Sequence, residues 1–321
     1  MFWSRCFVVI LASVFFQTHV HAIEPTTSGE QLLTQMAIAN RQLNYSGIFT
    51  YEHGGTLKTV KVFHAVQNEQ EMERLVLLSG PKQEVIRKGS DIDCAPLGDT
   101  TLRGKASGIV NLSKHQLENY YSIQIKPDDR VAGRDIAVLH VVPLDEHRYG
   151  YVLGLDKATG LLLQSLLIGN KNRVLERFQY VDVQIGDAID KADLEPDDGH
   201  HLVKAGASPC PSESDVFEAA VSGWQVGWLP PGYTLAGHEV AEASERETLI
   251  YTDGLSVFSL FIDPDMSTHL PQMQAQRGAT VAYLSKIVVA DHQYTICVVG
   301  EIPVETAKLV AQSVAPKPSL P

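Results

Sequence analysis

The residues that could carry chemistry are few, and they do not form a recognised catalytic set. His238-Glu239 begins the pattern of a zinc protease but lacks the second histidine that would complete it. His200-His201 lies beside Asp197 and Asp198, where weak metal binding competes with the favoured interpretation of a solvated linker. The chain has no Gly-x-Ser-x-Gly turn, no phosphate-binding glycine loop and no Cys-x-x-Cys pair. We therefore expect a protein that is not an enzyme and that needs no metal or other cofactor.

A cationic pair, His147-Arg148, stands at the start of the clearest hairpin in the chain. Its charge could meet a carboxylate of a partner protein or a phosphate of a lipid. A solvated pair at the end of a strand is the favoured interpretation.

The chain contains 4 cysteines, of which Cys6 belongs to the N-terminal segment. Cys94 and Cys210 lie in polar, proline-flanked segments, and we favour a disulfide between them, with two free thiols as the open alternative. Such a bridge would close a long loop and add roughly 4–5 kcal/mol to stability. Cys297 lies in the apolar run TICVVG and is expected to be a buried packing residue.

The N-terminus predicts export. Residues 1–22 combine Arg5, an apolar run from Cys6 to Phe16, and the small-x-small site Val20-His21-Ala22. This is the pattern of a signal peptide cleaved after Ala22, and the apolar run is too short to span a membrane. Removing Arg5 changes the net charge from 26 − 38 = −12 to 25 − 38 = −13. So acidic a chain is a poor candidate for binding nucleic acid.

The elements that must position these residues are mainly strands. Tyr149, Tyr151, Leu153 and Leu155 alternate along one strand, and the turn at residues 156–160 leads into a second strand that is apolar on both faces. A capping box at Ser28 and Gln31 predicts a helix over residues 28–42. The second strand of this hairpin spans residues 161–168, and seven further strand-like runs in the first part lie at residues 48–52, 57–66, 72–78, 83–88, 120–126, 136–142 and 175–183.

These patterns predict an α+β fold that is predominantly antiparallel β. The first domain, residues 23–186, is expected to be a half-closed barrel or a large curved sheet with one long helix. An acidic linker over residues 187–215 leads to a smaller mixed domain at 216–315 and a tail at 316–321. In the smaller domain we expect strands at residues 224–229, 248–252, 255–262, 280–284 and 294–299 and a helix over 303–314.

An apolar face in the first domain is the candidate lipid-binding site, although plain core packing is the competing interpretation for each residue. A large curved sheet has more apolar inner face than one helix can cover, so the surplus forms a pocket or is covered by residues 90–117. The candidate residues for lipid binding are Phe49, Tyr51, Phe63, Tyr149, Tyr151 and Leu153.

Several runs, taken together and in order, resemble a known family. They are LNYSGIFTYEHGG, HRYGYVLGLDKATGLLLQSLLI, ERFQYVDV, GWLPPGYTL, YTDGLSVFSLFI and VGEIP. They are similar to the RseB/MucB family of periplasmic negative regulators of sigma-E (AlgU-type) envelope stress signalling. The resemblance implies an unclosed barrel like that of the lipoprotein carriers LolA and LolB, followed by a small partner-binding domain.

The same resemblance implies a partner and a ligand. The partner would be the periplasmic segment of an anti-sigma factor (RseA or MucA), which this protein would shield from the site-one protease. Release would follow binding of a lipid or lipopolysaccharide. Candidate partner contacts in the second domain, for which core packing is again the favoured alternative, are Trp228, Tyr233, Tyr251 and Phe258. A periplasmic carrier or chaperone for lipids or lipoproteins, a hydrolase with an unrecognised site and pairing of two copies of the chain stay open.

Overall fold

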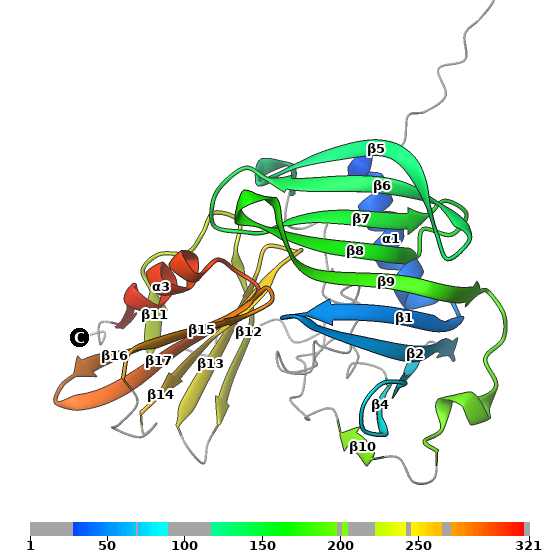
Figure 1. Ribbon diagram of the computed structural model, residues 1–321. Helices are drawn as coiled ribbons and strands as arrows, with labels where there is room; N and C mark the ends of the chain where they lie inside the picture. Colours follow the sequence, from blue (N-terminus) through cyan, green and yellow to red (C-terminus); the bar gives the residue numbers. More distant parts are fainter. Residues whose placement is uncertain are drawn as a thin grey trace, which may run out of the picture.

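Two sheets dominate the structure, which is a computed structural model (Figure 1). It describes residues 28–68, 70–88, 117–197, 201–204, 222–241, 245–264 and 271–317. The predicted signal peptide and both cysteines of the predicted disulfide, Cys94 and Cys210, lie outside these residues. Within the described ranges, no helix has the length and apolar character needed to cross a membrane.

The first sheet has ten strands and is open. Its edge strands in the described chain are β10 and β5, which are not joined. All neighbours run antiparallel except β10 and β4, which are parallel. The strands in sheet order are β10 (His201–Lys204), β4 (Gln83–Lys88), β3 (Gln70–Leu77), β2 (Thr56–Gln67), β1 (Tyr45–His53), β9 (Arg173–Ile185), β8 (Leu162–Gly169), β7 (Gly150–Asp156), β6 (Arg134–Pro143) and β5 (Tyr121–Val131). The expected fold, an unclosed and mainly antiparallel sheet, is confirmed.

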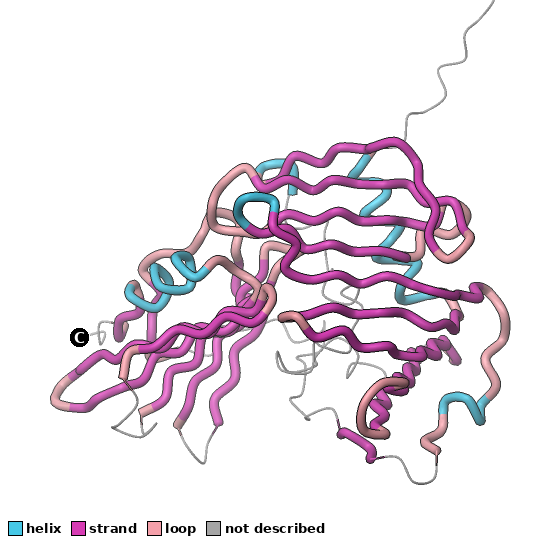
Figure 2. Tube along the Cα trace, in the orientation of Figure 1, coloured by secondary structure: helices cyan, strands magenta, loops and turns pink. Residues whose placement is uncertain are grey.

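One helix, α1 (Gly29–Gln42), lies across one face of this sheet (Figures 1 and 2). Its capping box forms as predicted: the Ser28 hydroxyl accepts from the Gln31 amide, and the Gln31 side chain accepts from the Ser28 amide. Leu33 and Met36 point into the sheet and are at most 1% exposed. The helix therefore closes the first core by covering the apolar face of the strands.

The stretch predicted as an acidic linker is partly attached to the first sheet. Leu194, in a short 3₁₀ helix over Lys191–Leu194, packs against Phe63. The buried Arg74 donates to Glu84 at 2.7 Å and pairs with Asp197 at 2.8 Å. Strand β10 then pairs with β4. The described residues 187–197 and 201–204 thus belong structurally to the first sheet, which differs from the expected start of the linker at 187.

The second sheet has six strands and carries one helix. The strands in sheet order are β12 (Thr234–Ala241), β13 (Arg246–Thr252), β14 (Val257–Asp263), β17 (His292–Gly300), β16 (Thr280–Val289) and β15 (Met273–Arg277). Helix α3 (Val304–Gln312) packs on β16 and β17, and the short strands β11 (Trp224–Val226) and β18 (Val314–Pro316) pair beside it. The predicted C-terminal helix, which starts after Pro303, is confirmed.

Candidate functional site at the junction of the two sheets

Five of the six predicted lipid-binding residues share the face of the first sheet that α1 covers. Tyr51 lies opposite Phe178 on β9, Phe178 lies opposite Ser165 on β8, and Ser165 lies opposite Leu153 on β7. Directly opposed residues in antiparallel strands point to the same side. Phe49, Tyr51, Tyr149, Tyr151 and Leu153 are at most 6% exposed, so in this structure they pack as core. Their role in lipid binding stays a prediction.

Phe63 lies on the opposite face, and the prediction that it shares the α1 side is wrong. Phe49 is paired with Val60, which places Val60 and Val62 under the helix and Phe63 on the other side. There Phe63 packs against Leu194, with the Lys61 amine 4.6 Å from its ring centre. The ring anchors the segment around residue 194 and is separated from the α1 side by the sheet itself.

The tyrosines at one end of the α1-covered face extend their hydroxyls into the second sheet. Tyr149 donates to the Ile302 carbonyl at 3.1 Å, and Tyr151 donates to the Leu255 carbonyl at 3.1 Å. Burial raises the pKa of Tyr149 to about 12 and that of Tyr151 well above its ordinary value, so both hydroxyls stay protonated donors. The ring of each tyrosine packs in the first core, and its hydroxyl donates a hydrogen bond to a carbonyl of the second domain.

Two turns of the second sheet enter the first core. Leu255, in the turn between β13 and β14, and Ala279, between β15 and β16, belong to the same buried apolar cluster as Tyr51 and Tyr151. The Ala279 amide donates to Glu176 Oε1 at 2.9 Å, and Tyr51 donates to Glu176 Oε2 at 2.5 Å. The second sheet therefore closes the end of the face that α1 leaves open.

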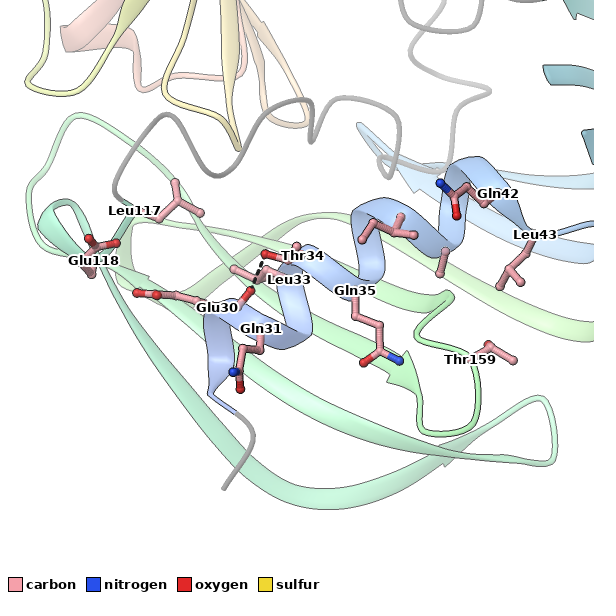
Figure 3. Close-up of a pocket in the computed structure, with 12 residues that line it drawn as sticks. Glu30, Gln31, Leu33, Thr34, Gln35, Gln42, Leu43, Leu117, Glu118 and Thr159 are labelled. Carbon is pink, nitrogen blue, oxygen red and sulfur yellow. Dashed lines mark hydrogen bonds between the residues drawn. The ribbon is translucent and has the colours of Figure 1, made fainter. Parts of the chain in front are cut away.

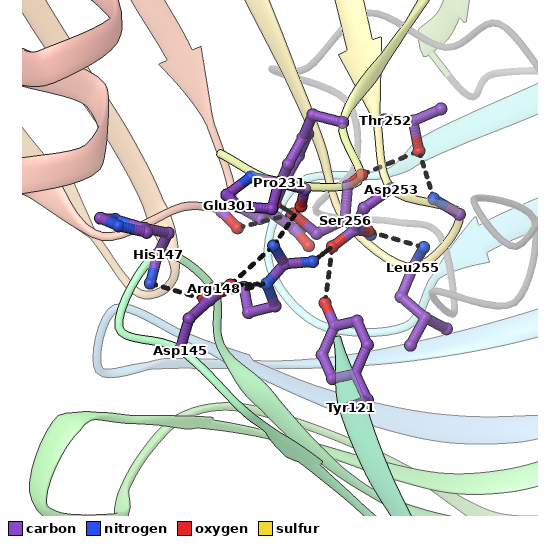
Figure 4. A network of polar contacts seen from close by, with 12 residues as sticks. Tyr121, Asp145, His147, Arg148, Pro231, Thr252, Asp253, Leu255, Ser256 and Glu301 are labelled. Carbon is purple, nitrogen blue, oxygen red and sulfur yellow. Dashed lines mark hydrogen bonds and ion pairs between the residues drawn. The ribbon is translucent and has the colours of Figure 1, made fainter. Parts of the chain in front are cut away.

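Arg148 forms the centre of a buried polar network at this junction (Figure 4). Its Nη1 donates to Asp253 Oδ2 at 2.8 Å, its Nη2 to the Pro231 carbonyl at 2.5 Å, and its Nε to Asp145 at 3.0 Å. The residue is 2% exposed, which overturns the expectation of a solvated cation at a strand end. Burial alone would lower the pKa of Arg148, but the hydrogen bonds with Asp145 and the charge of Asp253 raise it above its ordinary value.

Asp253 has a full set of partners from both sheets. Its Oδ2 also accepts from the Tyr121 hydroxyl at 2.8 Å, and its Oδ1 accepts from the amides of Leu255 at 3.0 Å and Ser256 at 2.8 Å. Buried carboxylates need such compensation, because an unpaired charge in an apolar interior is very costly. Sequence reasoning missed this pair, since Arg148 and Asp253 are remote in the chain. The available signals were a charged residue beside an apolar hairpin and the Asp253-Gly254 turn.

The predicted partner-contact residues occupy mainly core positions. Tyr233, Tyr251 and Phe258 are at most 7% exposed and pack in the second core, as the core-packing interpretation expected. Trp228 is half-buried, and its ring meets that of His147 from the first sheet at 5.1 Å in an edge-to-face contact. Contact of any of these four residues with a partner stays a prediction.

A groove of about 650 Å³ follows the outer side of α1 (Figure 3). Ile38, 50% exposed, contributes an apolar surface to it. Glu30 and Glu118 lie together at one end (Figure 3), where burial and the neighbouring Glu118 raise the pKa of Glu30. The residues that line the groove are Glu30, Gln31, Leu33, Thr34, Gln35, Ile38, Ala39, Gln42, Leu43, Leu117, Glu118 and Thr159. Most of these side chains are polar or charged, and Leu33, Ala39 and Leu117 are buried.

Of the residues singled out for catalysis or metal binding, Asp198 and His200 lie outside the described residues. No three His, Cys, Asp or Glu residues of the described chain converge as a metal site. His238 pairs with Glu247 at 3.1 Å, and the Ser222 hydroxyl donates to the same carboxylate at 2.6 Å. The carboxylate lies between serine and histidine, so the imidazole is not placed to take the serine proton. Cys297 is a free, half-buried thiol whose pKa is raised by burial.

Comparison with known proteins gives consistent matches over both sheets. The model of the MucB/RseB N-terminal domain matches residues 28–197, and that of the MucB/RseB C-terminal domain matches residues 218–315. The chain is 34% identical over 292 residues to the sigma factor AlgU regulatory protein MucB of Pseudomonas aeruginosa, covering 89% of this chain and 90% of that protein. It is 26% identical over 318 residues to the sigma-E factor regulatory protein RseB of Escherichia coli, covering 95% of each.

Solved structures agree with the sequence matches. The complex structure of Pseudomonas aeruginosa MucA/MucB superimposes with a TM-score of 0.72 at 32% identity, covering 91% of this chain and 99% of that one. A crystal structure of MucB in complex with MucA(peri) gives a TM-score of 0.70, again at 32% identity, covering 91% of this chain and 100% of that one. The similarity therefore spans both sheets.

Proposed function

Because the chain belongs to the MucB/RseB family, we propose that it is a periplasmic regulatory protein that binds the periplasmic segment of an anti-sigma factor related to MucA. The observation that carries this proposal is the similarity across 91% of the chain to a MucB structure that contains MucA. A protein that shares only the first domain's fold would not match over the second domain as well.

The consequence of binding is protection of the partner. A bound anti-sigma segment is inaccessible to the site-one protease, and the sigma factor stays inactive while its antagonist is intact. Export to the periplasm, with cleavage after Ala22, places the protein where such a segment is exposed. N-terminal sequencing of the protein recovered from the periplasm tests the cleavage site.

Release of the partner is governed by a lipid or lipopolysaccharide ligand of the first domain. The groove along α1 and the aromatic face beneath the helix are the surfaces that we expect an acyl chain to use. The ligand acts only if it binds the partner-free form better than the partner-bound form. Moving the complex from mostly bound to mostly free requires about 5 kcal/mol of differential affinity.

A binding titration tests the proposal. The mature chain is mixed with the purified periplasmic segment of the anti-sigma factor from the same cell, and calorimetry measures affinity and stoichiometry. We expect a saturable complex that a segment of scrambled sequence does not form. The absence of a complex, combined with transfer of an acylated protein from one membrane to another, would favour the lipid-carrier alternative. That alternative leaves the second domain without a role.

A further inference from the structure

The antiparallel strands at the edges of the two large sheets are β5, β12 and β15 in the described chain, and two of them oppose pairing with another strand. Strand β5 contains Pro127, and its register with β6 shifts between Lys126 and Asp129. Strand β12 has a register shift between Leu235 and Gly237. Prolines and bulges are usual means by which proteins keep a sheet edge from pairing with another chain. These two edges are therefore poor sites for an added strand.

Strand β15 has neither feature. Its five residues, Met273–Arg277, contain no proline, are all exposed, and pair with β16 without a shift in register. Within the described chain β16 is its only neighbouring strand. In an antiparallel edge strand, alternate residues direct their N–H and C=O groups away from the sheet. The β15 edge therefore presents donors and acceptors that match those of an extended peptide.

A small pocket of about 220 Å³ lies beside this edge. The residues that line it are Gln272, Met273, Gln274, Tyr283 and Lys308. The amine of Lys308 is 3.7 Å from Glu305, but the two side chains are 42% and 80% exposed, so this ion pair is weak. When a peptide adds to a sheet edge, backbone pairing provides affinity and side-chain pockets provide specificity. This pocket has room for one side chain, and Lys308 favours an acidic one.

The charges around this edge are positive, although the whole chain has a net charge of −12. The charged residues of strands β15 and β16 are Arg277 and Lys286. Arg277 Nη2 is 3.5 Å from the Thr56 hydroxyl, a neutral partner that leaves the charge of the guanidinium in place. Lys308 adds a third cation at the pocket. A segment that carries carboxylates complements this surface, and complementary charge supports both the rate and the specificity of association.

We propose that the open edge of β15 binds an extended, acidic stretch of the anti-sigma segment as a seventh strand of the second sheet. The backbone of the segment pairs with β15, and one of its carboxylate side chains enters the pocket beside Lys308. This inference rests on the proposed function, which supplies the partner, and it assigns that partner a place on the molecule.

Pairing of this kind explains how a bound segment escapes proteolysis. Backbone groups that are bonded to β15 are not available to a protease that must bind the same stretch. Cleavage then depends on the fraction of time that the segment spends detached. The edge of β15 protects the stretch that pairs with it directly, without any need to touch the protease.

Proline substitution tests the edge, because proline lacks the N–H group that a paired strand requires. Adjacent residues alternate between bonding β16 and facing the open edge, so one of Gln274→Pro and Ala275→Pro leaves the β15–β16 pairing intact. The variant that loses less stability in urea is the open-edge variant. We expect its Kd for the fluorescently labelled periplasmic segment of the anti-sigma factor to rise at least about tenfold, since a backbone hydrogen bond is lost and the approach of the strand is obstructed.

The matched control is the same pair of substitutions in β12, Glu239→Pro and Val240→Pro, selected in the same way. Its milder member should leave the Kd within about twofold of the wild type, because the β12 edge takes no part in binding.

Charge reversal tests the pocket. Lys308→Glu should raise the Kd about fivefold or more, because it replaces an attraction by a repulsion at a partly exposed site. Lys191→Glu makes the same change in net charge on the first domain, where the side chain is 83% exposed, and should leave the Kd unchanged. Equal effects of the two reversals would show that the segment senses only the overall charge, which contradicts a carboxylate beside Lys308.

The titrations separate this inference from the proposed function. Equal affinities of the wild type and the open-edge variant would overturn the inference and leave the proposed function standing. A wild-type chain that does not bind the segment would refute both. If the open-edge variant binds the segment normally but loses self-association in sedimentation, the edge binds a second copy of the chain and the proposal is wrong.

Amide exchange of the wild type decides the matter if both prolines in β15 unfold the second sheet. With saturating segment, the amide of either Gln274 or Ala275 should exchange at least about tenfold more slowly than in the free chain, because it gains a backbone acceptor. The amides of Glu239 and Val240 in β12 should be unaffected. Unchanged exchange of both β15 amides in the complex would overturn the proposal.

Discussion

Arg148 and Asp253 form an ion pair of 2.8 Å between the two sheets, and the side chains of both are fully buried. The pair joins the loop before β7 to the turn after β13, and so it couples the packing of two separate cores. A buried ion pair between two sheets restricts their relative orientation. Any displacement would separate the two charges and leave at least one of them buried without a partner.

Arg148→Met should lower the free energy of unfolding by about 3–5 kcal/mol, since it leaves Asp253 buried without its cation. Arg130→Met is the control for an exposed pair. Arg130 pairs with Asp135 at 3.5 Å, and both side chains are more than two-thirds exposed, so we expect a loss below about 1 kcal/mol. Urea unfolding of both variants measures the difference. Similar losses would mean that the Arg148 pair does not stabilise the junction.

Gly278→Ala should disrupt the contact of the β15–β16 turn with the first sheet. Gly278 has φ +60, and a Cβ atom there would come within 2.6 Å of His53 Nδ1. Gly55 has φ +76 with nothing within 4 Å, so Gly55→Ala reports backbone strain alone, about 1–2 kcal/mol. We expect G278A to cost at least about 1 kcal/mol more than G55A. Equal losses of stability in G278A and G55A, measured by thermal unfolding, would show that the β15–β16 turn can move to accommodate the added Cβ atom.

Phe63→Ala and Phe49→Ala should each cost about 3–5 kcal/mol but loosen different parts of the molecule. Phe63 holds Leu194, near the Asp197 amide that donates to Glu84 at 3.1 Å. In F63A, hydrogen exchange at Asp197 should rise more than global unfolding accounts for. In F49A, on the α1-covered face, exchange at Asp197 should follow the global stability. The same exchange pattern in both variants would contradict the placement of Phe63.

The strands of the first sheet could be predicted well because their signals are local. Alternation at Tyr149–Leu155 and the Gly160 turn predict the β7–β8 hairpin, and the capping box at Ser28 predicts the start of α1; both are observed. Alternation also places Phe49 and Tyr51 on one face. Alternation does not reveal which residues of the next strand lie on the same side of the sheet as Phe49 and Tyr51. That depends on register, here Phe49 opposite Val60, and so Phe63 was assigned to the wrong side.

The junction could not be predicted because its contacts join residues far apart in the chain. Arg148 could be recognised as a cation near an apolar hairpin, but its burial depends on Asp253 and Pro231 from the second sheet. Strand β15 escaped prediction because its five residues, Met273–Arg277, are all exposed and carry no apolar alternation. The acidic composition of residues 191–197 concealed their attachment to the first sheet, because the sequence pattern does not show that a buried Arg74 pairs with Glu84 and Asp197.

His64 should make stability depend on pH. It is 2% exposed and stacks on Tyr45, and burial lowers the pKa of its imidazole. The unfolded chain therefore takes up a proton near pH 6.5 that the folded chain resists, and stability falls as pH drops below that value. One proton contributes at most about 1.4 kcal/mol per pH unit. His64→Asn should lose less stability between pH 7.5 and 5.5 than the wild type, measured by urea unfolding. Parallel losses would contradict this role.

The measurement that tests the central claim most directly is protease protection. The mature chain is mixed with the periplasmic segment of the anti-sigma factor, activated site-one protease is added, and cleavage of the segment is followed over time. The account predicts that saturating chain slows cleavage and that a lipid A-type or other anionic amphiphile restores it. Cleavage at the same rate with and without saturating chain, by a protease that the chain does not itself inhibit, would contradict the claim that this protein shields an anti-sigma factor.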